Sequence, residues 1–426
     1  MSPASFFYTV EFKTITPEVI KNNLLNLSQV VFEVTSACNF RCEYCSYGRL
    51  YVHDKAESYK NESLSFSDAK ALIDYLASGW SSHMPHTPNQ EVYISFFGGE
   101  PLLNMRLISK IVAYIESLHS LNRRFVYSMT TNGWLLDKYQ EYLVKKDFHL
   151  LISLDGDKYS NSYRISAGGT QTYDKLIKNI LYLRNNYPAY FEKRVLFNAV
   201  LHNRNSLSKV TQYFVDTFGK TPQVSPLASS NVNPKYLDDF NRMKQTAETF
   251  EKLDDKAKEA LIKQQFFNIP IIHDIVRDYF LNSGNVFRSY NELVFGQDSR
   301  HFQTGTCTPF SKKVYLCTNG DILACERIPS KFSIGRIVGG KVYLNNEEIA
   351  SRYNTWLGLL SKFCRSCARS TTCNQCVFQI DDFPNNTACS GYLTHEKYEE
   401  LRKQYFSILG KHPELYKLIF ENVILT

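Results

Sequence analysis

The stretch Cys38-Asn-Phe-Arg-Cys42-Glu-Tyr-Cys45 follows directly after the β-rich run 29–35 and decides how the rest of the chain is interpreted. Three thiolates this closely spaced can bind three irons of a cubane cluster and leave the fourth iron open to a substrate or cofactor. Soft thiolate ligands suit iron–sulfur clusters or zinc. A zinc knuckle lacking one ligand is the alternative, but no fourth Cys or His lies at the usual zinc spacing. The motif therefore favours an iron–sulfur centre.

The chain of 426 residues has a composition that is ordinary for a globular protein, with 43% hydrophobic and 21% charged residues. The net charge of +7 is spread along the sequence, so it is only a weak hint of an acidic peptide or nucleic acid as partner. Neither a signal peptide nor an apolar run of membrane-spanning length is evident. We therefore expect a cytoplasmic protein with no membrane association, in which the eleven cysteines serve as metal ligands or catalytic thiols rather than disulfides.

Strands and helices alternate through the first half of the chain. Strands are predicted at 6–13, 29–35, 91–97, 124–131, 149–154 and 193–201. A small helix is predicted to begin after Thr16, with Pro17 at its first position, and the helix near residue 67 has Ser67 as its expected N-cap. At least five βα units imply an α/β fold with a parallel sheet and helices outside it.

Polar or glycine-rich segments follow three of these strands. Because the carboxyl ends of parallel strands meet at one edge, we expect these segments to lie beside the three-cysteine loop. Each segment alone would be an ordinary turn, but their occurrence in order on one edge indicates a site. The residues are Gly98, Gly99 and Glu100, then Asn132, then Ser153 and Asp155.

The Cys-x3-Cys-x2-Cys spacing, with the aromatic Tyr44 before the last cysteine, resembles the signature of the radical S-adenosylmethionine (SAM) superfamily. The resemblance implies a partial (β/α)6 barrel with a [4Fe–4S] cluster that chelates SAM, and it places Tyr44 near the adenine. The loops resemble the GGE and SxDG motifs of this superfamily. They imply that Gly98–Glu100 bind the SAM ammonium and that Ser153 and Asp155 bind the ribose or carboxylate. Arg164 is placed like the arginine that meets the SAM carboxylate, although Asp157-Lys158-Tyr159 replaces the usual His-Asp lead-in.

Eight further cysteines lie between residues 307 and 389 and resemble the SPASM domain of peptide-modifying radical SAM enzymes. One departure is Cys373-x2-Cys376, where the usual gap is one residue longer. Two four-cysteine zinc sites are the alternative for these residues. The resemblance implies two auxiliary [4Fe–4S] clusters. Their implied ligand sets are Cys307, Cys317, Cys325 and Cys376 for one, and Cys364, Cys367, Cys373 and Cys389 for the other.

The implied organisation is an N-terminal extension (1–27), a radical SAM barrel (28–230), a helical connector (231–300), a SPASM domain (301–395) and a closing helix (396–426). The N-terminal extension looks too short for a leader-peptide recognition domain, so leader binding would need another surface or a separate protein. An electron donor such as a flavodoxin or ferredoxin is a further implied partner, and no nucleic acid is expected.

The resemblance implies a radical SAM oxidoreductase that matures a ribosomally synthesised (RiPP) precursor peptide. A 5′-deoxyadenosyl radical would abstract hydrogen, and the product would be a crosslink or an epimer. An anaerobic sulfatase-maturating enzyme, which forms formylglycine, is the runner-up. In that family an Asp after an auxiliary-cluster cysteine acts as base, and here Glu326 follows Cys325. A non-catalytic metal-bound adaptor for a peptide or nucleic acid is the alternative of another class. The sequence does not identify the peptide or the bond formed.

Overall fold

The computed structural model describes residues 11–52, 61–85, 90–118, 121, 123–244, 272, 274–276, 278 and 301–422. Two compact units make up the chain. The sheet unit comprises Glu18–Ala260 and Pro309–Asn346, and the terminal unit comprises Met1–Pro17, Leu261–Thr308 and Glu347–Thr426. The segment 301–395, predicted as a SPASM domain, therefore contributes to both units.

The sheet unit is built on a ten-stranded sheet with the order β12-β11-β10-β9-β2-β3-β4-β5-β6-β7. Strands β2 to β7 are adjacent in sequence order and all parallel, which confirms the predicted α/β fold and the open barrel of six βα units. Strand β9 is also parallel to β2, and β10 to β12 continue the sheet as antiparallel hairpins. The strands are β2 (Gln29–Thr35), β3 (Gln90–Gly98), β4 (Arg123–Thr131), β5 (His149–Ser153), β6 (Val195–Leu201), β7 (Gln223–Pro226), β9 (Val314–Leu316), β10 (Asp321–Leu323), β11 (Gly335–Val338) and β12 (Lys341–Tyr343).

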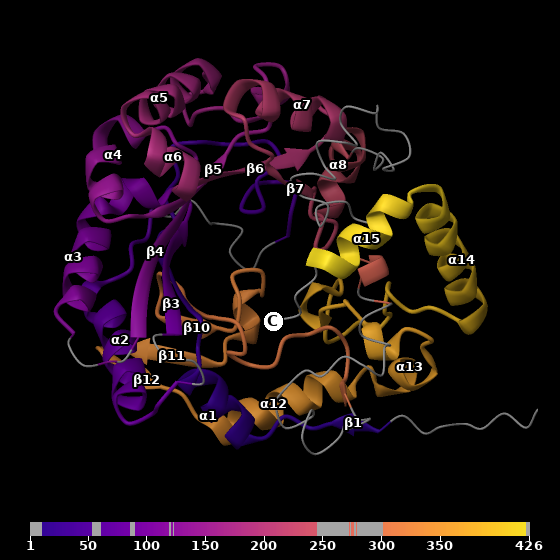
Figure 1. Ribbon diagram of the computed structural model, residues 1–426. Coiled ribbons are helices and arrows are strands. Elements are labelled where there is room, and N and C mark those ends of the chain that lie inside the picture. Colours follow the sequence, from indigo (N-terminus) through magenta and orange to yellow (C-terminus); the bar gives the residue numbers. More distant parts are fainter. Residues whose placement is uncertain are drawn as a thin grey trace, which may run out of the picture. The chain divides into compact units, whose positions relative to one another are not determined.

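Amphipathic helices lie outside these strands (Figure 1). Helix α3 is typical, because Ile108, Ile111, Val112 and Ile115 share one buried face at helical spacing. The helices of this unit are α1 (Pro17–Leu25), α2 (Phe66–Ser81), α3 (Met105–Glu116), α4 (Leu136–Lys145), α5 (Tyr173–Asn186), α6 (Pro188–Arg194), α7 (Leu207–Phe218) and α8 (Leu237–Met243). Short 3-10 turns are η1 (Pro101–Asn104), η2 (Ser160–Tyr163), η3 (Pro234–Tyr236) and η6 (Ser330–Phe332).

Helix α2 begins earlier than predicted. Ser65, not Ser67, is its N-cap, and the Ser65 side chain accepts a hydrogen bond from the backbone N–H of Asp68. The predicted cap was wrong because Phe66, which is partly buried, starts the helix and leaves Ser67 inside its first turn. By contrast, α1 begins at Pro17 as expected.

The core of the sheet unit is formed by the strand interiors. Residues 30–35 of β2 are all buried, as expected for a strand covered on both faces. Farther along the sheet, Phe197 of β6 stacks on Phe218 of α7 with ring centroids 4.7 Å apart. Such packing fixes the strands, and therefore the loops at their carboxyl ends.

The terminal unit contains a short parallel pair, β1 (Phe12–Lys13) with β8 (His301–Phe302), and several helices. These are α12 (Asn346–Gly358), α13 (Ser361–Ser366), η7 (Ser370–Thr372), η8 (Val377–Gln379), α14 (His395–Lys411) and α15 (Pro413–Asn422). The expected single closing helix is two helices, because Pro413 cannot donate to the helix that ends at Lys411. Of the predicted strand 6–13, only residues 12–13 form a strand in the described part of the chain; most of the predicted connector 231–300 lies outside it.

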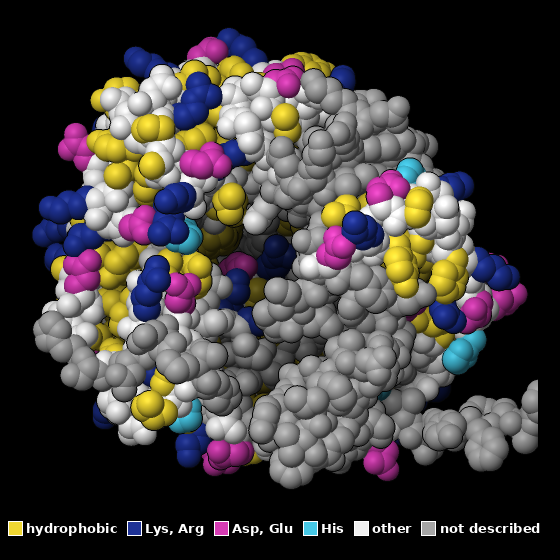
Figure 2. Space-filling model, viewed as in Figure 1, with side chains coloured by type: hydrophobic (Ala, Val, Ile, Leu, Met, Phe, Trp, Pro, Cys, Tyr) yellow, Lys and Arg dark blue, Asp and Glu magenta, His cyan; other side chains and the backbone are white. Residues whose placement is uncertain are grey.

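Charged side chains are interspersed over the outer helices of the sheet unit rather than gathered into one patch. Figure 2 shows Lys and Arg side by side with Asp and Glu on this face. The pairs Lys146–Glu116 (2.7 Å) and Lys70–Asp74 (2.6 Å) are examples. None of the described helices is long and apolar enough to cross a membrane.

Candidate functional site

The carboxyl ends of β2 to β6 meet at one edge of the sheet, and the predicted site residues gather there. Thr35 at the end of β2 pairs with Gly98 at the end of β3, and Ser153 at the end of β5 pairs with Asn198 of β6. The three-cysteine loop follows β2 at this edge. The expectation that the loops converge is therefore fulfilled for the sheet unit.

The three-cysteine loop is held by backbone contacts to the end of η2 and to the residues that follow it. The Arg41 N–H donates to the Ile165 carbonyl (2.8 Å) and the Glu43 N–H to the Tyr163 carbonyl (3.1 Å). The Arg41 guanidinium also donates to the carbonyl of Cys38 (2.7 Å). These bonds fix the path of a loop that has no regular secondary structure.

The thiols of this loop lie within electrostatic reach of one another. Burial raises the pKa of Cys38 and of Cys42 to about 12, and the charge of a Cys45 thiolate adds to both shifts. Three such thiolates are costly without a cationic partner, and iron supplies one. The donor set therefore fits a cluster ligated by Cys38, Cys42 and Cys45.

Gly98 at the end of β3 and Gly99 directly after it allow a close approach to the backbone between Thr35 and Ala37. A Cβ on Gly99 would lie 2.2 Å from the Ala37 carbonyl oxygen, and one on Gly98 would lie 2.1 Å from the Thr35 carbonyl oxygen. Gly98 also has φ +135°, a conformation that other residues rarely adopt. These glycines let β3 approach the backbone leading into Cys38. Their contact with the SAM ammonium stays a prediction.

Glu100 is a buried carboxyl group that joins two loops, with an exposed fraction of 1%. Its Oε1 accepts hydrogen bonds from the Leu102 N–H (3.0 Å) and the Thr131 hydroxyl (2.7 Å), and its Oε2 accepts one from the Asn132 N–H (2.7 Å). Burial raises the pKa of Glu100 to about 7, although these three bonds oppose the shift. Oε2 retains a lone pair that can accept another hydrogen bond.

Asn132 connects the loop after β4 to the three-cysteine loop. Its Nδ2 donates to Asn39 Oδ1 (2.8 Å) and lies 3.9 Å from Cys38 Sγ, while its Oδ1 accepts the Trp134 N–H (3.0 Å). Asn132 thus touches a predicted iron ligand directly.

Asp155 is fully buried and is engaged by protein groups on both oxygens. The Tyr44 hydroxyl and Arg164 Nε (3.2 Å) donate to Oδ2, and the Val200 N–H donates to Oδ1 (3.0 Å). Burial acts to raise the pKa of Asp155, but the Arg164 guanidinium and His202 outweigh it and hold the pKa below its usual range. Asp155 therefore orders Tyr44 and Arg164, and its side chain does not face open space.

Arg164 is buried beside Tyr44 of the three-cysteine loop. Only Nε of its side chain has a hydrogen-bond partner among the described residues, and the guanidinium lies 5.7 Å from the Tyr44 ring centroid. The charge of Arg164 also acts on the Cys42 thiol. A planar guanidinium beside the three-cysteine loop can bind a carboxylate through two parallel N–H bonds. Ser153 lies partly exposed at the end of β5.

His202 is a site residue that the sequence argument missed. Its ring is fully buried and stacks on Tyr44 with centroids 5.6 Å apart. The Arg204 N–H donates to Nδ1 (3.2 Å), and Nε2 lies 3.3 Å from Asn205 Nδ2 and 3.7 Å from Asp155 Oδ2. The signal was available, because the polar run 202–205 directly follows β6 as the other site loops follow their strands.

The predicted auxiliary ligands are divided between the two units: six of the eight cysteines belong to the terminal unit and two to the sheet unit. In the terminal unit, the charges of Cys373, Cys389 and Cys367 all act on the Cys364 thiol, whose pKa is raised to about 11 mainly by burial. In the same unit Cys307 acts on Cys376, while Cys317 and Cys325 belong to the sheet unit. None of the eleven cysteines forms a disulfide, and no three His, Cys, Asp or Glu side chains in the described residues are arranged to hold a single metal ion.

Glu326 lies beside Cys325 after β10, as its sequence position requires. Cys325 Sγ lies 3.4 Å from Glu326 Oε2, and Lys313 Nζ lies 3.1 Å from the same oxygen. Burial acts to raise the pKa of Glu326, but Lys313 outweighs it and lowers the pKa. The carboxyl is therefore held in its charged form.

The sheet unit that carries this site is similar to a known superfamily of proteins. Residues 32–211 match the model of the radical SAM superfamily, so the chain contains a radical SAM domain. The superfamily implies SAM and a [4Fe–4S] cluster as cofactors, and the relatives described below include a cyclopropyl synthase and a sulfatase-maturating enzyme, which supports an enzymatic role for this chain. The alternative of a non-catalytic adaptor is thereby disfavoured.

Among curated relatives, the radical SAM cyclopropyl synthase TigE of Paramaledivibacter caminithermalis is 29% identical over 49% of this chain and 42% of its own length. The uncharacterized protein MJ0907 of Methanocaldococcus jannaschii is 31% identical over 37% of this chain and 49% of its own. The chain thus spans less than half the length of these two proteins. A cysteine-type anaerobic sulfatase-maturating enzyme of Clostridium perfringens strain 13 is 22% identical over 87% of this chain and 96% of its own.

A solved structure, native anSMEcpe with bound AdoMet and Cp18Cys peptide, has the same fold. It matches with a TM-score of 0.55 at 18% identity, over 92% of this chain and 99% of that chain. The match extends well beyond the radical SAM domain, so the cysteine-rich C-terminal region is included in the shared fold.

Proposed function

We propose that this chain is a radical SAM maturase of a ribosomally made precursor peptide. The observation that carries the proposal is the convergence of the Cys38–Cys45 loop, the Glu100–Asn132 contact and the Arg164 guanidinium at one sheet edge. When bound there, the cluster and SAM would supply a 5′-deoxyadenosyl radical that abstracts hydrogen from the peptide.

Some residues of the site are proposed to contact SAM, and others to hold the contacting residues in position. The terminal nitrogens of Arg164 suit the SAM carboxylate, and the free lone pair of Glu100 Oε2 suits the ammonium. Ser153 suits the ribose, and Tyr44, from its place in the three-cysteine motif, is proposed to lie near the adenine. Asp155, which has no open face, holds Tyr44 and Arg164 in position instead of contacting SAM.

Two auxiliary [4Fe–4S] clusters are part of the proposal. Full cysteine ligation would leave no open iron, so each cluster would serve as an electron relay. The grouping of Cys364, Cys367, Cys373 and Cys389 in the terminal unit supports the second ligand set. A flavodoxin or ferredoxin is the proposed electron donor for the SAM-binding cluster, and a separate protein is the proposed binder of a leader peptide.

Glu326 is proposed as the base that takes the proton released when a peptide radical is oxidised. Its charged form, stabilised by Lys313 at 3.1 Å, is the form that a base requires. Glu326→Gln keeps the size of the side chain and removes the base. Product formation should collapse while deoxyadenosine release continues, and Glu347→Gln on the exposed side of α12 is the matched control. Product at the normal rate in Glu326→Gln would place the base elsewhere.

A sulfatase-maturating activity is the second candidate, and the carboxyl group directly after Cys325 favours it. The two candidates are distinguished by co-expressing the chain either with a short peptide encoded beside its gene or with a sulfatase-derived peptide. Mass spectrometry would show a crosslinked product in the first case and a formylglycine in the second. A product that gains solvent deuterium without net oxidation would instead indicate an epimerase and would overturn the relay role.

A further inference from the structure

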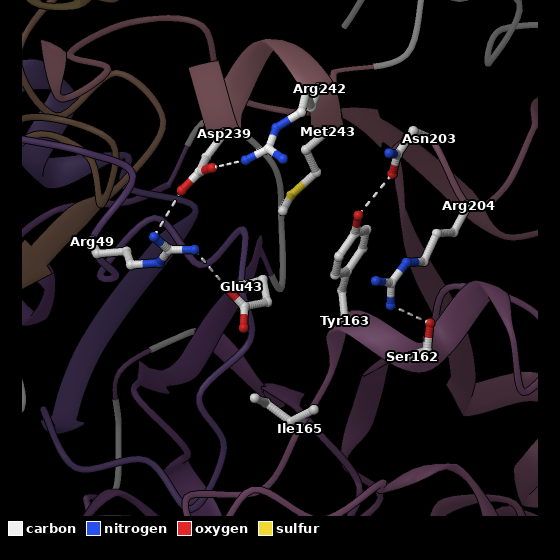
Figure 3. Close-up of a pocket in the computed structure, with 10 residues that line it drawn as sticks. All are labelled: Glu43, Arg49, Ser162, Tyr163, Ile165, Asn203, Arg204, Asp239, Arg242 and Met243. Atoms are coloured by element: carbon white, nitrogen blue, oxygen red, sulfur yellow. Dashed lines mark hydrogen bonds and ion pairs between the residues drawn. The ribbon is translucent and has the colours of Figure 1, made fainter. Parts of the chain in front are cut away.

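A pocket of about 460 Å³ opens beside the three-cysteine loop within the sheet unit (Figure 3). Glu43, which lies between two cluster cysteines, lines it together with Tyr163, whose carbonyl accepts the Glu43 N–H (3.1 Å). Arg204, two residues after the buried His202, forms another wall. The pocket is therefore tied through the backbone to the proposed radical site.

The charges in this pocket do not balance. Arg49 is paired with Asp239 (2.8 Å) and with Glu43 (3.3 Å), and Arg242 also contacts Asp239. Three arginines and two carboxylates line the pocket. Among the described residues, Arg204 is the lining arginine that has no carboxylate partner. One positive charge is therefore left over.

Arg204 is the source of this excess charge, and it is held in place. Its Nη1 donates to the Ser162 hydroxyl (2.7 Å), and its guanidinium lies 3.6 Å from the centroid of the Tyr163 ring. The Tyr163 hydroxyl in turn donates to Asn203 Oδ1 (2.9 Å). A guanidinium fixed in this way loses little entropy when it binds an anion.

We propose that this pocket binds the carboxylate of an Asp or Glu residue of the peptide substrate, with Arg204 as the specificity-determining residue. This inference rests on the proposed function and adds a sequence preference to it. A single carboxylate neutralises the single excess charge, whereas a phosphate would bring more negative charge than the pocket can pair. The remaining donors of Arg204 suit one carboxylate.

The test uses the reconstituted full chain with SAM under anaerobic conditions and a randomised library of short synthetic peptides on beads. The wild-type chain should enrich Asp and Glu among captured peptides. Arg204→Gln should lower that enrichment about tenfold, as expected for the loss of a charged hydrogen bond. Arg204→Lys should retain part of it, and Arg204→Glu should shift the enrichment to Lys and Arg. Arg106→Gln, on the exposed side of α3, is the control that should match the wild type.

Iron content checks that each variant is folded, and SAM affinity is measured alongside. The proposal is overturned if the wild-type chain shows no acidic preference or if Arg204→Gln retains it. An equal loss of SAM affinity in Arg204→Gln would assign the pocket to the cofactor and would also overturn it. A wild-type chain that releases no deoxyadenosine from SAM would instead contradict the proposed function.

Discussion

The Tyr44 hydroxyl donates a hydrogen bond to the Asp155 carboxylate and thereby joins the three-cysteine loop after β2 to the loop after β5. Arg164 donates to the same oxygen at 3.2 Å, so one buried carboxylate orders an aromatic ring and a guanidinium together. The two loops are 111 residues apart in sequence. The geometry of the proposed cofactor site therefore depends on a fully buried carboxylate that holds two other site residues in position.

Replacing Asp155 by Asn should destabilise the protein strongly. The substitution leaves the Arg164 charge, 8% exposed, without its buried partner, and breaking such a pair costs about 3–5 kcal/mol. Asp137→Asn is the matched control, because its ion pair with Lys175 is well exposed and contributes at most about 1 kcal/mol. Denaturant unfolding of the two variants measures the difference. Equal free energies of unfolding would show that Asp155 and Arg164 are not coupled as described.

Glu100 should make the stability of the metal-free protein depend on pH. Its folded-state pKa of about 7 lies above the ordinary value of 4.5, so the folded protein binds this proton more tightly than the unfolded chain. The contribution of Glu100 to the free energy of unfolding is on the order of 3 kcal/mol. This contribution is complete below about pH 4.5 and is lost as the pH rises through about 7. Glu100→Gln should remove this part of the pH profile.

The check on Glu100 is a series of unfolding curves between about pH 5 and pH 8, which spans most of the window that the two pKa values define. Glu141→Gln on the exposed side of α4 should keep the wild-type profile. The assignment would be wrong if the Glu100→Gln and wild-type profiles ran parallel.

Gly99→Ala should disturb the three-cysteine loop, because its Cβ would lie 2.2 Å from the Ala37 carbonyl oxygen. Ala37 directly precedes Cys38, so the backbone must move at the first iron ligand. We expect the loss of about one cluster's share of iron, measured after anaerobic reconstitution. Gly168→Ala, which meets nothing closer than 3.8 Å, is the control and should keep its iron. Full iron content in Gly99→Ala would show that the loop tolerates the shift.

Periodicity and strand-end chemistry were sufficient to predict the parallel sheet and the location of the site. The run 29–35 coincides with β2, because Val30, Val31, Phe32 and Val34 make it rich in apolar residues, as expected for a strand buried on both faces. Local capping was less predictable: Ser65 and Ser67 both suit an N-cap, and only the position of Phe66 decides between them. The buried role of Asp155 depends on contacts between loops that are distant in sequence, which no sequence pattern reveals. His202, by contrast, lies in a polar run that directly follows β6 and could have been found.

The central claim is most directly tested by SAM cleavage in the anaerobically reconstituted and reduced protein. The wild-type chain should bind about twelve irons in three cubane clusters and should release 5′-deoxyadenosine from SAM. The variant with Ala at Cys38, Cys42 and Cys45 should lose about four irons and all deoxyadenosine release, while the other clusters remain. Zinc in place of iron, or deoxyadenosine release that persists without these three cysteines, would contradict the account.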